Sequence, residues 1–133
     1  MTKNIWVFAE QVNNDISSVT LELLGEATRI AKSTGDDTEI SAILLGDNLL
    51  DCAQKLIFFG ADKVYLAEDS RLSYYSNEAY SKIIASIAKA HKPDIFLIGS
   101  TAIGSELAPT IAAKLETGLA AHCVELRINE KGE

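Results

Sequence analysis

The sequence predicts a single α/β domain of three layers, in which helices cover both faces of a mainly parallel five-stranded sheet. Three observations predict this class. Short apolar segments alternate with longer segments of helical periodicity along the chain, which is typical of βαβ units. The 133 residues are 47% hydrophobic and 23% charged, as expected of one globular domain. The segment 95–98 is wholly apolar, like a central strand covered on both faces.

The first part of the chain supplies two predicted strands with a helix between them. The segment 5–10, which is apolar up to Glu10, predicts a strand, and the polar segment 11–18 predicts a hairpin-like loop after it. Apolar side chains then recur with helical spacing over 19–34. A second strand is predicted over 39–45, where six of seven residues are uncharged and most are aliphatic.

The middle of the chain repeats this alternation. A second helix is predicted to begin at Asp47 or Asn48, because either side chain can cap it. A third strand is predicted over 63–67, and the longest loop follows it over 68–77. A third helix comes next, and Pro93 is expected to end it. The residues assigned to the buried stripe of the second helix are Leu49, Ala53, Leu56 and Ile57.

The end of the chain completes the predicted sheet. A fourth strand is predicted over 94–98 and a fifth over about 121–128, with a helix between them that ends at 117–118. Parallel strands joined in this way need right-handed crossovers. We therefore assign the domain to 1–128, and expect the polar segment 129–133 to be a turn that enters a further segment or a trimmed end.

One strand-to-helix junction is a candidate ligand site. The fourth predicted strand runs into Gly99, Ser100 and Thr101, and Gly104 and Ser105 open the next helix. Backbone N–H groups and hydroxyls at a helix N-terminus can form a cradle for an anion or an adenylate. The simpler interpretation is a tight turn whose glycines allow close approach of the backbone. The sequence leaves both interpretations open.

Other classes of site lack their sequence signatures. The first strand-to-helix turn, 9–15, contains no glycine, so it carries no dinucleotide or P-loop fingerprint, and its carboxylates would repel a pyrophosphate. No base is placed beside the hydroxyls of the candidate loop, which makes a hydrolase the least supported hypothesis. His91 and His122 have no carboxylate or cysteine at a spacing that would make either a ligand or a base, so we expect structural roles for both. Tyr74 and Tyr75, in the longest loop, are most simply core or surface-anchor aromatics, and the alternative is a partner surface.

Charge, cysteine content and hydrophobicity limit the ligand classes and the cellular location that the sequence favours. The formal net charge of −7, with no cluster of Lys and Arg, argues against nucleic-acid binding. Cys52 and Cys123 lack metal-ligand spacing and predict core positions in a reducing compartment. No apolar run approaches the roughly 20 residues that span a bilayer. Residues 1–4 lead directly into the first strand, so we expect no signal or transit peptide and a cytoplasmic location.

Motifs along essentially the whole chain resemble, in their order and spacing, the N-terminal domain of the electron transfer flavoprotein alpha subunit. They begin with WVFAEQ at 6–11 and VTLELLG at 19–25, and they end with TGL at 117–119. Between these lie AILLG, GADKVY, PDI, LAP and AAKL, at 42–46, 60–65, 93–95, 107–109 and 112–115.

The resemblance implies an adenine-nucleotide-alpha-hydrolase-like (Rossmann-like) fold and an electron carrier, not an enzyme with its own substrate turnover. In that family the alpha subunit pairs with a beta subunit, and its N-terminal domain packs against the related beta domain. FAD, which receives electrons from flavin dehydrogenases, is held mainly by the C-terminal domain of alpha, and beta holds AMP where AMP is bound. The resemblance therefore implies no catalytic residue, no metal and little or no flavin on this chain alone. It also implies that the polar segment 129–133 leads toward a C-terminal domain that this sequence lacks.

Three positions depart from the family's pattern. Ser105 and Thr110 stand where family members often carry arginine, and His122 precedes Cys123 where aspartate is common. The missing basic residues weaken any anion-binding role of the candidate loop. The alternative that remains open is a stand-alone adenine-nucleotide-binding module of the universal-stress-protein type, although the glycine spacing expected after the fourth strand in that family is not met.

Overall fold

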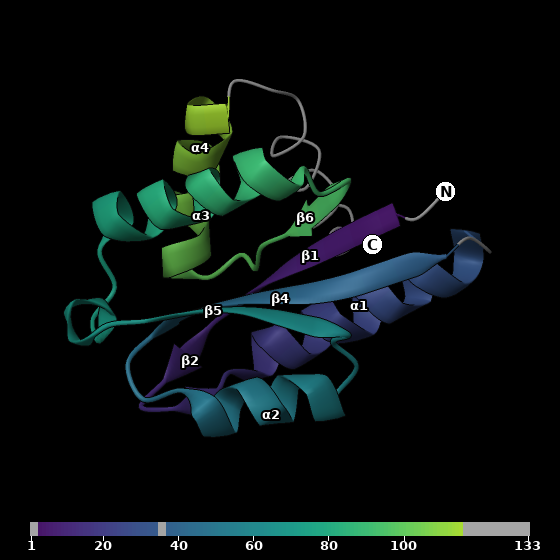
Figure 1. Cartoon of the computed structure of the whole chain (residues 1–133), viewed down its shortest axis with the longest axis horizontal. Coiled ribbons are helices and arrows are strands. Elements are labelled where there is room, and N and C mark those ends of the chain that lie inside the picture. Colours follow the sequence, from purple (N-terminus) through teal and green to yellow (C-terminus); the bar gives the residue numbers. More distant parts are fainter. Residues whose placement is uncertain (1–2, 35–36, 116–133) are drawn as a thin grey trace.

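The computed structural model describes residues 3–34 and 37–115, and they form three layers (Figure 1). The middle layer is a parallel sheet whose strands lie in the order β5-β4-β1-β6. The strands are β1 (Lys3–Ala9), β4 (Thr38–Gly46), β5 (Lys63–Glu68) and β6 (Ile95–Leu97). The three-layer α/β class predicted from the sequence is therefore confirmed.

Helices of the described residues cover both faces of the sheet (Figure 1). One face packs against α1 (Ser18–Thr34) and α2 (Leu50–Phe58), and the other against α3 (Asn77–His91) and α4 (Ala102–Leu115). The central strands β1 and β4 are buried along nearly their whole length. Each strand therefore sends alternate side chains into two separate apolar cores, which explains its continuous apolar sequence.

The order of the strands places a topological switch point beside β1. The chain moves from β1 outward to β4 and β5, and then returns to the opposite side of β1 to form β6. Right-handed crossovers in opposite directions bring the connecting helices to opposite faces. A crevice for ligands typically opens at such a point, beyond the carboxyl ends of the strands.

A small hairpin extends beyond the carboxyl end of β1. It consists of β2 (Gln11–Val12) and β3 (Asp15–Ile16), which pair antiparallel. The two turn residues, Asn13 and Asn14, have φ angles of 51° and 66°. Asparagine tolerates this left-handed conformation, which two-residue hairpin turns require. The hairpin-like loop predicted over 11–18 is thus confirmed.

The start and outer face of α2 differ from the prediction. Neither Asp47 nor Asn48 caps the helix, because its N-cap residue is Leu49, which forms no side-chain cap bond. The N–H of Leu49 instead donates to Glu68 Oε2 at 2.7 Å, at the end of β5. Ile57 was assigned to the buried stripe, but it is 53% exposed. The reason is that α2 lies beside the edge strand, where the sheet covers only part of the helix.

The remaining elements agree closely with the predicted ones. A short 3-10 helix, η1 (Ser70–Leu72), interrupts the longest predicted loop. Helix α3 ends before Pro93, as predicted, with Lys92 in a left-handed conformation. The predicted helix end at 117–118, the predicted strand at 121–128 and the polar segment 129–133 lie outside the described residues.

Candidate functional site

The switch point brings two segments together that are far apart in the sequence. Glu10 directly follows β1, and the candidate loop from Gly99 to Ser105 connects β6 to α4. Strands β1 and β6 are parallel neighbours, with Ile5 opposite Ile95. Their carboxyl ends therefore meet at one edge of the sheet.

A hydrogen-bonded chain joins these two segments. Thr101 Oγ1 donates to Glu10 Oε2 at 2.6 Å. The same hydroxyl accepts a hydrogen bond from the backbone N–H of Gly104 at 2.9 Å. Thr101 thus satisfies one of the N–H groups that the first turn of α4 leaves without a helical partner. The carboxylate of Glu10 completes this arrangement from the other strand.

The backbone of Glu10 is fixed by a buried threonine of α1. Thr20 is fully buried, and its hydroxyl donates to the carbonyl of Glu10 at 3.0 Å. The same hydroxyl accepts from the N–H of Glu10 at 2.8 Å. Buried hydroxyls and backbone groups carry a free-energy cost unless they are paired, so this double contact holds the chain where it leaves β1.

The two glycines of the candidate loop are required for close packing. A Cβ atom at Gly104 would lie 1.9 Å from the carbonyl oxygen of Gly99. A Cβ atom at Gly99 would lie 2.7 Å from Val19 Cγ2 of α1. Both positions are therefore closed to side chains by neighbouring protein atoms, which agrees with the tight-turn interpretation.

The hydroxyl residues of the loop do not share one environment. Thr101 and Ser100 are half-buried, whereas Ser105 is exposed. The N–H of Ser105 already donates to the carbonyl of Thr101 at 2.8 Å, within the first turn of α4. The helix begins at Ala102, two residues before the predicted opening at Gly104. The structure therefore brings Thr101 to Glu10, a residue that the sequence had marked only as unfavourable for phosphate.

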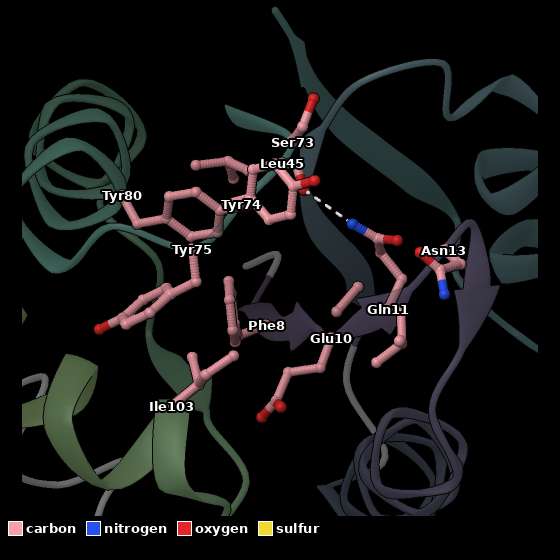
Figure 2. A pocket seen from close by; sticks show the side chains of 12 residues that line it. Phe8, Glu10, Gln11, Asn13, Leu45, Ser73, Tyr74, Tyr75, Tyr80 and Ile103 are labelled. Carbon is pink, nitrogen blue, oxygen red and sulfur yellow. Dashed lines mark hydrogen bonds between the residues drawn. The ribbon is translucent and has the colours of Figure 1, made fainter. Parts of the chain in front are cut away.

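A cavity of about 240 Å³ lies beside Glu10 at the same edge of the sheet (Figure 2). Its walls come from the end of β1, the hairpin, the loop after η1, α3 and α4. The side chains of Tyr75 and Tyr80 meet edge to face in its wall, with ring centroids 5.1 Å apart. The lining residues are Phe8, Ala9, Glu10, Gln11, Val12, Asn13, Leu45, Ser73, Tyr74, Tyr75, Tyr80 and Ile103.

Hydrogen bonds hold the tyrosine wall in place. Tyr75 Oη donates to Glu106 Oε1 at 2.8 Å and accepts from Asn77 Nδ2 at 3.0 Å. Tyr80 Oη donates to the carbonyl of Leu72 at 2.8 Å. Burial raises the pKa of both tyrosines. These phenols therefore stay neutral hydrogen-bond donors at neutral pH.

Burial also raises the pKa of Glu10, and the hydrogen bond from Thr101 partly opposes this shift. A half-buried carboxyl group beside a cavity can hold a proton or bind a cation. It disfavours a phosphate at the same place, since both groups would carry negative charge. Among the described residues, no group of three or more His, Cys, Asp or Glu side chains is arranged to hold a metal ion.

Replacing Glu10 by glutamine is expected to change how stability depends on pH. The folded-state pKa of Glu10 lies above its ordinary value of 4.5, so its stabilising contribution is complete below pH 4.5 and is lost as pH rises through the folded pKa. The free energy of unfolding of Glu10→Gln should therefore rise relative to the wild type between pH 4 and pH 7. Urea denaturation at both pH values measures this difference.

The matched control for this prediction is Glu22→Gln. Glu22 is an exposed carboxylate on α1, and the substitution changes the net charge by the same amount. Its stability difference from the wild type should not follow the same pH dependence. Equal pH profiles for the two variants would contradict a specific role of the Glu10 environment.

Sequence reasoning gave Phe8 and Tyr80 no role at the cavity, because it assigned them to a strand and to a helix. Only the spatial meeting of β1 and α3 shows that both residues line it. A sequence signal was present for Glu10, because polar residues just after a parallel strand lie at the edge where ligands bind.

The chain is similar over almost its whole length to electron transfer flavoprotein sequences. It matches the family described as "Electron transfer flavoprotein domain" over residues 5–132. It is 45% identical to the electron transfer flavoprotein subunit alpha of Thermoanaerobacterium thermosaccharolyticum, over 98% of this chain and 39% of the relative. It is 42% identical to the subunits of the same name from Clostridium acetobutylicum and Megasphaera elsdenii, in each case over 96% of this chain and 37% of the relative.

Two further facts bear on the family assignment. The chain spans about two fifths of the length of these curated relatives. No helix in the part of the chain that the structure describes is long and apolar enough to cross a membrane. The family match covers nearly every residue of the chain. The α/β fold that the resemblance implied is also the fold that the structure has. The chain therefore belongs to the electron transfer flavoprotein domain family.

Proposed function

We propose that this chain is the N-terminal scaffold and subunit-interface domain of an electron transfer flavoprotein alpha subunit. In this role it supports electron transfer from flavin dehydrogenases through FAD that is held elsewhere in the protein. The observation that carries the proposal is the alignment of 98% of this chain, at 45% identity, with a relative named electron transfer flavoprotein subunit alpha. The relatives are longer, so FAD binding is expected in sequence that this chain does not contain.

The site geometry supports a role without a bound flavin on this domain. The cavity at the switch point measures about 240 Å³, below the range of roughly 300–1,000 Å³ that is typical of small-molecule pockets. FAD carries a pyrophosphate, and the half-buried carboxyl of Glu10 stands where a Rossmann-type site would receive phosphate. We therefore expect an electron-carrier subunit that provides no catalytic residue, and a cytoplasmic heterodimer with a beta subunit.

Co-expression tests the proposal. The longest open reading frame that contains this sequence is expressed together with an electron transfer flavoprotein beta subunit from the same source. Gel filtration with light scattering should give a one-to-one complex, and its absorbance should show bound flavin. The chain 1–133 alone, incubated with FAD and desalted, should retain little flavin. Two separate peaks in the first experiment would contradict the subunit role.

The alternative function, a stand-alone adenine-nucleotide-binding module, has less support. Its expected site is the loop from Gly99 to Ser105, where neighbouring atoms close both glycine positions and Glu10 adds negative charge. Calorimetric titration of the chain with ATP and AMP separates the two functions. Heat of binding to either nucleotide would favour the alternative, and its absence would leave the subunit role as the supported function.

A further inference from the structure

The cavity at the switch point has an unusually aromatic wall. Four of its lining residues carry aromatic rings, namely Phe8, Tyr74, Tyr75 and Tyr80 (Figure 2). The face of an aromatic ring is electronegative, so it attracts a cation that comes within about 6 Å. Hydrogen bonds of their hydroxyls hold Tyr75 and Tyr80 in place, whereas Tyr74 is 86% exposed and lies at the rim.

A carboxyl group completes the lining. Glu10 uses one oxygen, Oε2, to accept from Thr101. Its other oxygen, Oε1, has no hydrogen-bond donor within the described residues, and no ion pair of Glu10 is formed there. None of the described side chains that line the cavity is a lysine, an arginine or a histidine. The positive partner that this carboxylate would favour is therefore not supplied by the cavity wall.

A second carboxylate, which does not itself line the cavity, contacts Tyr75 of its wall. Glu106 of α4 accepts a hydrogen bond from the hydroxyl of Tyr75. This bond orients the tyrosine and draws electron density toward its ring, which improves the ring as a partner for a cation. The whole chain carries a formal charge of −7, so cations are also attracted at longer range.

The size of the cavity limits its occupant. A volume of about 240 Å³ corresponds to roughly eight water molecules at their volume in the liquid. This volume lies below the roughly 300–1,000 Å³ typical of small-molecule pockets, and phosphate is disfavoured by Glu10. An ammonium or guanidinium head with a short apolar stem matches the volume, the rings and the carboxylate together.

We propose that the cavity formed by Phe8, Glu10, Tyr74, Tyr75 and Tyr80 binds a small organic cation with an ammonium or guanidinium head. The head donates to Glu10 Oε1, and the stem lies against the aromatic rings. This proposal goes beyond the proposed subunit role, because it uses only residues of this chain and no flavin.

Nuclear magnetic resonance titration of the ¹⁵N-labelled full chain tests the site. The probe is n-butylamine, which is charged at neutral pH, and the matched neutral probe is n-butanol, at constant ionic strength. Butylamine should shift the amide signals of Glu10, Gln11 and Thr101 in a saturable way, and butanol should shift them much less. A butylamine titration without saturable shifts at these three residues would overturn the proposal.

Three variants show which groups carry the binding. Glu10→Gln keeps the shape of the side chain, removes its charge and should weaken butylamine binding by roughly tenfold or more. Tyr74→Ala, at an exposed position that tolerates truncation, should weaken it about two- to fivefold. Glu22→Gln, with the same change in net charge on the opposite face, should bind as the wild type does. Equal weakening by Glu10→Gln and Glu22→Gln would overturn the proposal, because it would reduce the effect to non-specific attraction.

Discussion

Replacing Gly104 by alanine is expected to destabilise the domain by about 3 kcal/mol or more. The added Cβ atom would lie 1.9 Å from the carbonyl oxygen of Gly99, and a backbone atom in a packed turn cannot move aside as the end of a side chain can. Overpacking a well-packed site costs about 1–3 kcal/mol and sometimes more. Here the backbone of the turn or of α4 must shift, which also disturbs the bond from Gly104 to Thr101. Urea denaturation followed by circular dichroism measures the effect.

The same substitution at Gly25 provides the matched control. Gly25 lies inside α1, and nothing lies within 4 Å of the position that its Cβ atom would take. Alanine favours a helix over glycine by about 0.5–1 kcal/mol, so Gly25→Ala should stabilise the domain by that amount. Effects of equal sign at the two positions would show that the contact with Gly99 does not decide the outcome.

Truncation of Phe96 to alanine is expected to cost about 3–5 kcal/mol, the range for large aromatic side chains removed from a core. Phe96 lies on β6 and is 1% exposed. Its ring meets that of Trp6 nearly edge to face, with centroids 5.5 Å apart. Since Trp6 is the sole tryptophan of the chain, the variant should also shift its fluorescence emission to longer wavelength. Urea denaturation followed by that fluorescence gives both results.

Phe58→Ala is the control for this aromatic truncation. Phe58 ends α2 and is 82% exposed, so its removal should change the free energy of unfolding by less than about 0.5 kcal/mol. The emission of Trp6 should stay as in the wild type. A loss of stability at Phe58 comparable to that at Phe96 would contradict the burial pattern on which the prediction rests.

The order and type of the described elements could be predicted from local sequence patterns. Apolar runs marked the strands β1 and β4, and helical spacing marked α1 and α3. Both signals are strong because each strand faces two cores and each helix faces one. The hairpin was recognisable from the polar residues of 11–18, since Asn13 and Asn14 adopt the conformation that its turn requires.

The errors occurred where a tertiary contact replaced a local one. Asp47 and Asn48 are residue types that often cap helices, but here the N–H of Leu49 donates to Glu68 of the neighbouring strand instead. Ile57 has the spacing of a buried residue, yet it is exposed because α2 lies beside the edge of the sheet. Neither outcome could be obtained from a window of sequence, because both depend on where β5 lies.

The sequence by itself determined the α/β class, the order of the elements in the described part and the family of the chain. These follow from periodicity, turn residues and motif order, which are local properties. The tertiary structure alone decided which residues meet at the candidate site, where Glu10 contacts Thr101, ninety-one positions later. That meeting depends on β6 returning to the free side of β1. Strand order is set by the packing of the whole domain, so no spacing within the sequence could reveal it.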